Sequence, residues 1–565
     1  MSDRDSDIEK AELPVRRSTD NDTSSSASDI SDLEKADTVP DPIPTSRVTP
    51  TATAQQSGIW RSRSQATDGF GTYNLEEDDD QLDSILAVQR TPTDAYEVRW
   101  DGKDDKLFPR NFSIARKWLI VSIVSLSSFL VTCTSSLYSV TYDQIMDEFH
   151  ISREVATLGL STFVLGLAVG PMMLAPLSEF YGRRPIYLAS MSMFVIWLVP
   201  EAVAQNIGTI LVSRFFDGLA GSAFLAVAAG TVVDMFDSRQ IAFPMMIYTA
   251  SPFLGPAAGP IIGGFINEYT SWRWSFYVLL IWSGVLFVTV ILFVPETFHK
   301  ILLKKKAQRK RKETGNDRWW ASAELDESSV VLRIIRACYT PVLLLALEPM
   351  CLMLCLYSAI LLGIVYLLFG AIPLIFRTNH GFELYQNGLA FLGIGIGMLA
   401  GVVTNPYWDK NYQRLVKGYE EKMGQKDIQP EPEFRLPPAM AGAILVPIGL
   451  FWFGWTTYAS VHWIVPIIAT AFFGAGVFLA FTGILTFLVD AYADYAASAV
   501  GANVLVRLAF AAGFPLFGVQ MYEVLGYQWA SSLLGFLGLA CLPLPFLFFK
   551  YGRRIRARSR FQVKT

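Results

Sequence analysis

Long apolar runs recur along most of this chain. Each holds about twenty residues, the length that a helix needs to cross the hydrocarbon core of a bilayer. Backbone polar groups in lipid must be satisfied within the segment, so runs of this length form helices. The sequence therefore predicts an all-α integral membrane protein with twelve transmembrane helices. The runs are residues 117–139, 155–177, 186–204, 208–230, 243–266, 274–294, 351–376, 387–405, 438–457, 463–489, 497–521 and 529–549.

A basic segment between the sixth and seventh runs divides the chain in two. Residues 296–340 contain eleven Lys/Arg, among them the stretch KKKAQRKRK. Residues 338–349, just ahead of the seventh run, are expected to lie along the membrane surface. The expected domains are a six-helix bundle over 113–297, a basic cytosolic linker over 298–340, a second six-helix bundle over 341–550 and a basic cytosolic tail over 551–565.

Positive charge predicts the orientation in the membrane. If the N-terminus is cytosolic, the inner loops hold the arginine pair at 183–184, the basic linker and the basic tail, whereas the outer loops hold only three arginines. Cytosolic loops of membrane proteins carry the excess of Lys and Arg. We therefore expect a multi-pass protein of the cell membrane with both termini in the cytosol.

The N-terminal region differs from the rest in composition. Residues 1–112 hold 13 Lys/Arg against 24 Asp/Glu and are rich in Ser, Asp, Thr and Pro. So little apolar side chain cannot offset the entropy of ordering, which predicts a disordered acidic cytosolic region. It contains no apolar signal-peptide segment. The overall charge of −4 gives no reason to expect nucleic-acid binding.

Charged residues inside the runs are few, and such a residue is a functional candidate by default. Arg214 and Asp217 lie three residues apart in the fourth run and so share a helix face. Asp217 is thus the nearest partner for Arg214, with a residue of the first run as a competitor. Glu201 lies near the outer end of the third run, and Arg507 lies roughly 15 Å into the eleventh. Two structural alternatives stay open: an Arg214–Asp217 pair that is merely neutral, and Arg507 as a packing anchor bonded to carbonyls.

Two runs carry glycines at four-residue spacing, which places them on one face of a helix. Small residues there let another helix approach closely, so the stripes indicate a pseudosymmetric contact or simply tight packing. Prolines in the fifth run remove backbone donors and should bend that helix. The stripes are Gly255, Gly259 and Gly263 in the fifth run, and Gly393, Gly397 and Gly401 in the eighth.

Signatures of other function classes are missing from the sequence. No G-x-x-x-x-G-K-[ST] stretch occurs, so ATP hydrolysis is not expected. The four histidines are scattered, and the five cysteines show no paired spacing of a disulfide framework or a zinc site. We expect no enzyme activity, no cofactor and no metal.

Several motifs between residues 98 and 558 resemble the major facilitator superfamily. More narrowly, they resemble the fungal twelve-span drug:proton antiporters of the cycloheximide, fluconazole and polyamine resistance type. "LSEFYGRRP" is similar to the signature between spans 2 and 3, and "LVSRFFDGLAGSA" to the span 4 motif. "VPETF", "FRLPPAM" and "VDAYADYAASA" are also typical of the fungal group. "GPAAGPIIGGF" is similar to the span 5 antiporter motif, which covers Gly255, Pro256, Gly259, Pro260, Gly263 and Gly264.

The resemblance implies two pseudosymmetric bundles that rock about a central site near mid-membrane. We expect proton coupling at Arg214 and Asp217, with the proton on Asp217 and Arg214 as its partner. Two positions depart from the pattern: Asp217 stands where many relatives are uncharged, and Gly370 where many carry Glu. The residues that match the cytosolic gate, a charge network latching the outward-open state, are Glu179, Gly182, Arg183, Arg184 and Asp234. The resemblance also implies a substrate cavity lined by spans 1, 4, 7 and 10. Besides Arg214 and Asp217, the residues expected to line it are Tyr138, Tyr366, Phe369, Phe478 and Phe481, together with Arg507 of span 11.

The function that this resemblance implies is proton-coupled efflux of small amphipathic organic compounds such as drugs, toxins or secondary metabolites. The aromatic candidates fit such substrates, since rings offer apolar area without demanding one geometry. The expected partners are the substrate, protons and the lipid bilayer, and the protein is expected to be a monomer. Two alternatives stay open: a proton-coupled importer of a nutrient or polyamine, and a non-transporting membrane sensor that signals through its N-terminal region.

Overall fold

Helices make up nearly all of the structure. The computed structural model describes residues 96–101, 105–237, 240–324, 330–424, 430–557 and 559. Among these residues no strand occurs, and the only β-type pairing is an isolated bridge between Glu97 and Trp320. The all-α prediction is confirmed. The predicted disordered region over 1–112 lies almost wholly outside the described residues.

The N-terminal half contributes six passes, one for each predicted run. Short 3₁₀ segments extend some of them, such as Tyr138–Thr141 after the first pass. Polar caps begin two of them: the Ser113 hydroxyl accepts from the Arg116 amide, and the Asn206 side chain accepts from the Thr209 amide. The passes are α3 (Ile114–Leu137), α5 (Arg153–Tyr181), α6 (Arg183–Ala202), the series α7 (Ile207–Gly221), α8 (Ala223–Ala226) and α9 (Ala228–Met235), then α10 (Ala242–Tyr269) and α11 (Trp272–Phe293), with α4 (Tyr142–Phe149) between the first two.

The C-terminal half repeats the arrangement. Its eighth and twelfth passes are broken into shorter helices, as the fourth is in the N-terminal half. The passes are α14 (Pro349–His380), the series α15 (Leu384–Ala390), α16 (Leu392–Val403) and α17 (Asn405–Met423), then α18 (Pro437–Trp455), α19 (Ile464–Ala491), α20 (Ala496–Leu525) and the pair α21 (Tyr527–Cys541) and α22 (Pro543–Arg556).

Eleven helical segments of the described chain are long and apolar enough to cross a membrane. The remaining pass, α10, has 28 residues, but prolines and glycines lower its hydropathy. Its three internal prolines, Pro252, Pro256 and Pro260, are tolerated because neighbouring helices surround it. The twelve predicted runs therefore all correspond to helical passes.

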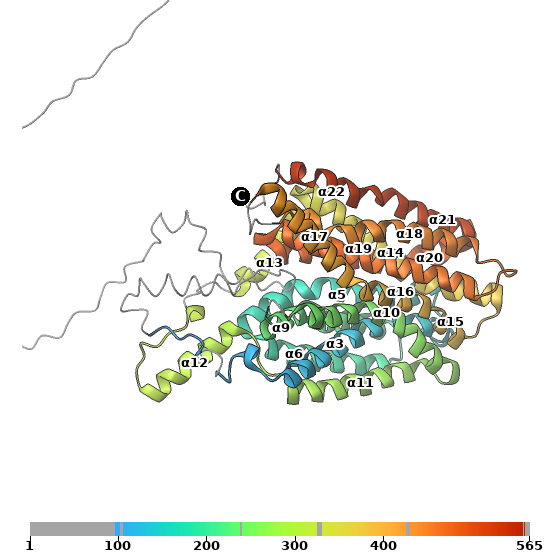
Figure 1. Ribbon diagram of the computed structural model, residues 1–565. Helices are drawn as coiled ribbons and strands as arrows, with labels where there is room; N and C mark the ends of the chain where they lie inside the picture. The colour runs from blue at the N-terminus through green and yellow to red at the C-terminus, as the bar shows by residue number, and fades with distance from the viewer. Residues whose placement is uncertain are drawn as a thin grey trace, which may run out of the picture. The chain divides into compact units, whose positions relative to one another are not determined.

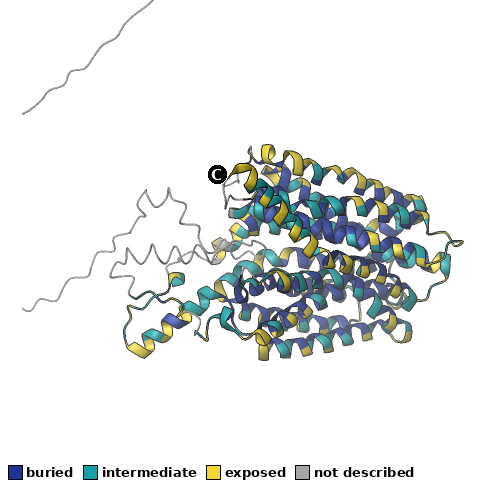
Figure 2. Cartoon of the chain, in the orientation of Figure 1, coloured by how far each residue is buried: buried dark blue, intermediate teal, exposed yellow. Residues whose placement is uncertain are grey.

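The two halves lie side by side, with the blue and green helices on one side and the orange and red ones on the other (Figure 1). Between the halves α5 packs against α20, and α10 packs against α15 and α16. One apolar core runs through both halves, and buried residues line the facing sides of the helices (Figure 2). Large apolar side chains such as Ile281, Leu292 and Val524 point outward, as expected for helices that face lipid.

The end of the bundle that carries the α5–α6 turn is called the basic end below. The end that carries α4 and the α14–α15 connection is called the opposite end. At the basic end the predicted linker contains two helices, α12 (His299–Thr314) and α13 (Val330–Leu347). α13 packs on α5 and α20 and exposes an apolar stripe that includes Val331, Ile335 and Tyr339. The position of residues 338–349 along the membrane surface stays a prediction.

The glycine stripes pack within their own halves. A Cβ at Gly259 would meet Ser136 and Leu137 of α3, and one at Gly397 would meet Ala471 of α19. The alternative of tight packing is what the structure shows, because each glycine stripe lies against a helix of its own half. α10 approaches the other half through different glycines: Gly264 faces the Leu384 carbonyl of α15.

Candidate functional site

Arg214 of α7 lies at the centre of a fully buried charge cluster. Its Nη1 atom is 3.7 Å from Oε2 of Glu201 in α6, and both side chains have 0% exposure. Nη1 and Nη2 donate to the Thr134 carbonyl at 3.2 and 3.3 Å, and Nη2 donates to the Ser135 carbonyl at 3.3 Å. Nε donates to the Gly159 carbonyl of α5 at 3.3 Å. Arg214 thus ties four helices of the N-terminal half together.

The expected partner of Arg214 is therefore wrong: the ion pair is with Glu201, not with Asp217. Side chains of a helix lean toward its N-terminus, so the long Arg214 side chain extends away from Asp217 and toward the end of α6. The expectation that the first pass competes was nearer the structure, since α3 supplies carbonyl acceptors.

Asp217 is fully buried and lacks a hydrogen bond. Neither of its carboxylate oxygens, nor either oxygen of Glu201, has a hydrogen-bond partner among the described residues. This part of the bundle thus holds one guanidinium and two carboxylates, which interact electrostatically. Because an isolated charge is costly to bury, the second carboxylate has a strong reason to hold a proton.

A polar contact carries this cluster across to the other half. The Ser135 hydroxyl on α3 is 3.0 Å from the Tyr366 hydroxyl on α14. The carbonyl of the same serine accepts from Arg214. Arg214 also lies over the rings of Tyr138 and Phe163, at 4.7 and 4.4 Å from their centroids. Ser135 is thus the residue at which the charge cluster meets the C-terminal half.

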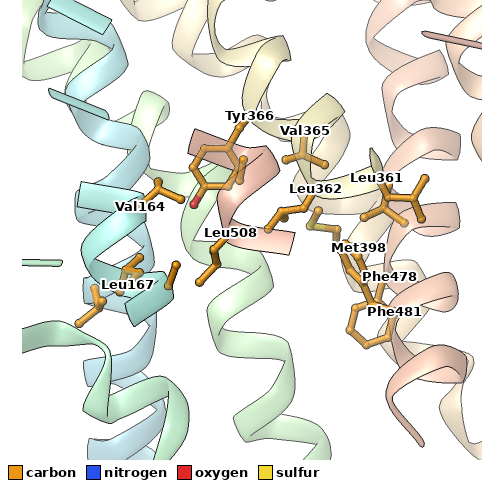
Figure 3. Packing of buried hydrophobic residues seen from close by; sticks show 14 of the residues in the cluster. Val164, Leu167, Leu361, Leu362, Val365, Tyr366, Met398, Phe478, Phe481 and Leu508 are labelled. Atoms are coloured by element: carbon orange, nitrogen blue, oxygen red, sulfur yellow. The ribbon is translucent and has the colours of Figure 1, made fainter. Parts of the chain in front are cut away.

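The predicted cavity residues lie in separate aromatic groups: Tyr138 packs on Tyr142 and Phe276 in its own half, whereas the rings of α19 meet a ring of the other half. Phe253 of α10, which the sequence reasoning missed, packs against Phe478 and Phe481 of α19 with ring centroids 5.5 and 5.4 Å apart. The rings of Tyr366 and Phe369 are 5.1 Å apart. Figure 3 shows Tyr366 near Val164 of α5, with Phe478 and Phe481 beside Met398. Proline-rich "SPFLGP" gave Phe253 no distinguishing signal.

Arg507 of α20 lies next to this aromatic surface. Its guanidinium carbon is 5.1 Å from the centroid of Phe481. Its Nε and Nη1 atoms are buried and have no hydrogen-bond partner among the residues that the structure describes. Neither nitrogen donates to a backbone carbonyl, which argues against the alternative that Arg507 is a packing anchor bonded to carbonyls.

The turn between α5 and α6 is a single residue, Gly182, with φ +101°. A side chain there would be strained, and a Cβ would also collide with the Glu296 carboxylate. Oε1 of Glu296 accepts from the Arg183 amide at 2.8 Å, and Oε2 accepts from the Arg184 amide at 3.2 Å. Glu296, from the "VPETF" stretch, was not among the predicted gate residues, yet it holds this turn in place.

Arg183 joins the turn to the end of α9. Its Nε is 3.2 Å from Oδ2 of Asp234, and its Nη1 donates to the Ser178 hydroxyl at 2.8 Å. Arg183 also lies over the ring of Phe298 at 4.7 Å, and Glu179 interacts with it electrostatically. The structure thus brings together Glu179, Arg183 and Asp234, as the sequence predicted. Arg184 points elsewhere and donates to the Ile291 carbonyl at 3.0 Å.

The C-terminal half has a matching pair that the sequence reasoning missed. Arg435, just before α18, donates from Nε to Oδ2 of Asp490 at the end of α19, at 2.8 Å. Arg435 lies over the ring of Tyr412 at 3.8 Å, as Arg183 lies over a phenylalanine. The motifs "FRLPPAM" and "VDAYADYAASA" contain this pair. The pair could have been predicted from its position in the sequence. Arg435 precedes pass 9 and Asp490 ends pass 10, as Arg183 begins pass 3 and Asp234 ends pass 4.

A short N-terminal segment packs against the linker helix α12. Lys306 of α12 contacts Asp101 and Asp105 at 2.7 and 2.5 Å. Burial by itself would lower the pKa of Lys306, but the hydrogen bonds to both carboxylates outweigh it and raise the pKa. His299, the first residue of α12, makes a 2.8 Å contact from Nε2 to the Asp234 carbonyl, and burial lowers its pKa. The linker therefore reaches the gate directly.

Polar contacts between the halves occur at the opposite end. The Leu384 amide donates to Oε2 of Glu268 at 2.9 Å, and Nη1 of Arg377 is 2.7 Å from Oδ2 of Asp143. A Cβ at Gly388 would collide with the Pro260 carbonyl, so α10 and α15 touch closely here. These contacts hold the halves together at the opposite end.

Comparison with known proteins agrees with this geometry. The model of the Major Facilitator Superfamily matches residues 124–513. The chain is 53% identical to "Efflux pump atB" of Aspergillus terreus over 84% of this chain and 91% of that protein. It is 41% identical to "Probable drug/proton antiporter YHK8" of Saccharomyces cerevisiae over 81% of this chain and 88% of that protein.

A solved structure shares the fold. The proton:xylose symporter XylE bound to 6-bromo-6-deoxy-D-glucose superposes with a TM-score of 0.54, covering 78% of this chain and 96% of that one. The two sequences are only 14% identical. The match therefore supports the arrangement of the helices and nothing about substrate.

Proposed function

Because the chain belongs to the major facilitator superfamily, and within it to the fungal drug:proton antiporters, we propose that it exports small amphipathic organic compounds in exchange for protons. It is a multi-pass membrane transporter and not an enzyme. We propose that it is a monomer in the cell membrane. The charge distribution favours an orientation with the basic end and both termini in the cytosol.

The observation that carries the proton-coupling proposal is the cluster of Glu201, Arg214 and Asp217. Arg214 can neutralise one carboxylate, so the second stays charge-free only by binding a proton. In the proposal Glu201 holds the guanidinium and Asp217 carries the transported proton on a carboxylate oxygen. A shift of Arg214 toward Asp217 would release that proton and leave Glu201 to take the next one.

Substrate binding is coupled to this shift through Ser135. Its carbonyl accepts from Arg214 and its hydroxyl contacts Tyr366 of the other half. A compound that enters between the halves separates or reorients these two contacts. Substrate and the Arg214–Glu201 arrangement then compete, which is what exchange of substrate for proton requires.

The gate at the basic end fits alternating access. The Arg183–Asp234 pair and the Arg435–Asp490 pair lie at equivalent places of the two halves. We propose that they latch the state in which the basic end is closed and the opposite end open, when the bundles rock about the central site. The contacts at the opposite end, such as Arg377 with Asp143, hold the alternate state.

Transport direction is the decisive test. A yeast strain depleted of its own efflux pumps, expressing the chain, identifies a toxic compound to which it gives resistance. Everted membrane vesicles from that strain are then loaded with an acidic lumen and given the labelled compound. An antiporter accumulates the compound, and accumulation stops when the pH gradient is collapsed.

An importer coupled to protons gives the reverse result, because its substrate leaves the lumen together with the protons. Vesicles of the same strain without the chain set the background. Equal uptake with and without the pH gradient would contradict proton antiport.

A further inference from the structure

Arg507 occupies the middle of the membrane on the inward side of α20. It lies 11 residues after the start of a 30-residue helix, or roughly 16 Å along it. Ala499, Asn503 and Ala511, at four-residue spacing from it, are fully buried. The stripe that contains Arg507 therefore faces the protein and not the lipid.

The guanidinium has no counter-charge in the part of the chain that the structure describes. The groups that interact with it electrostatically are the Tyr366 hydroxyl and the Cys355 thiol, and neither of them is a carboxylate. The two carboxylates at the basic end of the C-terminal half have other partners: Glu348 accepts from the Tyr492 hydroxyl at 3.2 Å, and Asp490 pairs with Arg435.

Several donors of Arg507 are unused. Arginine has five N–H donors in a planar fork, and two buried nitrogens of this one make no hydrogen bond. Burying such donors without a partner costs free energy. A structural arginine at the same depth looks different, since Arg214 donates to three carbonyls and pairs with Glu201.

Apolar rings surround this unpaired cation. Phe481 lies under the guanidinium, and Phe253 stacks on Phe481 from the other half of the protein. Tyr366 and Phe369 add a second aromatic pair on α14. Because Phe253 belongs to α10, the rings come from both halves and separate when the halves rock.

We propose that the exported substrates are amphipathic anions, and that Arg507 binds their carboxylate while the rings of Phe253, Phe478 and Phe481 hold their apolar body. This inference rests on the proposed export function and names its substrate class. An arginine fork matches the two oxygens of a carboxylate and is weakly hydrated, so it suits a partly buried anion site. A cationic compound would meet like charge at the same place.

The experiment compares two probes that differ only in charge. Purified full-length protein in detergent is titrated with the fluorescent compounds 1-pyrenebutanoate and 1-pyrenebutanamide, without any pH gradient. We expect the carboxylate to bind about tenfold more tightly than the amide, as a charge-assisted pair in a partly buried site provides.

Three variants assign the preference to one residue. Arg507→Gln should bind both probes equally, at the affinity of the amide for the wild-type protein. Arg507→Lys should keep part of the preference, because it retains charge but not the bidentate fork. Arg554→Gln, the same change at an exposed arginine of α22, should bind as the wild-type protein does.

Equal binding of the two probes by the wild-type protein would overturn the inference, as would a preference that survives Arg507→Gln. The wild-type comparison does not depend on any variant folding. Uptake by everted vesicles separates this result from the proposed function. If the everted vesicles take up only uncharged compounds, the export function holds and the anion site is refuted. If the protein binds the anion selectively but the vesicles show no gradient-driven uptake, the anion site holds and the export function is refuted.

Discussion

Two arginines lie deep in the membrane, one in each half, and they differ in how their donors are used. Arg214 bonds to the carbonyls of Thr134, Ser135 and Gly159 and pairs with Glu201. Arg507 stacks on Phe481 and leaves two buried nitrogens unbonded. A charge that is satisfied by the protein belongs to its permanent machinery. A buried charged side chain whose donors have no protein partner is instead a candidate site for binding substrate.

The strongest test of this difference is stability. Arg214→Leu leaves Glu201 and Asp217 buried without a cation and removes ties to α3 and α5, which should cost about 3–5 kcal/mol. Arg507→Leu removes a buried charge without a partner, so the protein should be as stable as the wild type or more so. Thermal unfolding of the purified proteins in one detergent, followed by tryptophan fluorescence, measures both.

Opposite signs for the two leucine variants would sharpen the comparison. Similar losses would break it, because they would mean that Arg507 has a structural role of the same kind as Arg214. The leucine variant of exposed Arg554 controls for the removal of positive charge from the protein as a whole.

Variants of the Arg214 cluster and of Arg507 should differ in their effect on substrate-driven proton movement. Asp217→Asn removes the proposed carrier, so substrate-driven proton movement should fall about tenfold or more while substrate still binds. Glu201→Gln should also uncouple, because Arg214 then turns to Asp217. Arg507→Gln should keep the ratio of protons to substrate for an uncharged substrate. The measurement is a pH dye inside proteoliposomes, read when substrate is added.

The carrier assignment fails if Asp217→Asn still moves protons at the wild-type ratio. In that event Glu201, the other carboxylate of the cluster, becomes the candidate carrier, and the Glu201→Gln variant tests it.

The paired latches at the basic end offer a smaller contrast. Arg183→Ala loses the contacts to Asp234 and Ser178 and should lower transport several-fold with normal insertion, since a latch sets the balance between states. Arg435→Ala removes the equivalent pair with Asp490 and should act in the same direction. Transport rates at equal amounts of membrane protein decide, and unchanged flux in both variants would make these clusters simple turns.

The smallest effect is expected where the N-terminal segment meets α12. Lys306→Met should expose the segment around Asp101 and Asp105 to limited proteolysis and change transport less than about twofold, because these ion pairs lie outside the membrane passes. The hydrogen bonds to Asp101 and Asp105 raise the Lys306 pKa against the effect of burial, and the bond from Lys306 lowers the Asp105 pKa against the same effect.

The pH window follows from these directions. Stability from Lys306 is complete below its ordinary pKa of about 10.4 and is lost as pH rises through the raised value. Stability from Asp105 is complete above about pH 3.9 and is lost as pH falls through the lowered value. Proteolysis of this segment should therefore be constant between about pH 5 and 9, and a change within that range would contradict the assigned contacts.

Much of the gate could be predicted, because its residues are neighbours of sequence landmarks. Gly182 and Arg183 lie in a short polar turn between two apolar runs, and Asp234 ends the fourth run at the same membrane face. Glu296 and the Arg435–Asp490 pair escaped prediction. Glu296 meets the turn only because the segment after α11 folds back onto the start of α6, and Arg435 meets Asp490 only because α18 packs on α19.

The central site shows the same limit. Sequence spacing placed Asp217 on the face of Arg214, yet Arg214 pairs with Glu201 of another helix. Phe253 lies in a stretch rich in proline and glycine, and only the tertiary structure shows that its ring stacks on Phe481 of α19. Periodicity describes one helix at a time, and the partner across an interface depends on how each helix is rotated.

The sequence by itself determined the number of membrane passes, their division into two halves and the place of the basic turn. Those features follow from the length of the apolar runs, which must match the bilayer thickness, and from the position of the positive charges, which sets the orientation. The tertiary structure decided which buried charges have partners. Whether a donor is satisfied depends on every group packed around it, and so Arg214 and Arg507, similar in sequence context, have different roles.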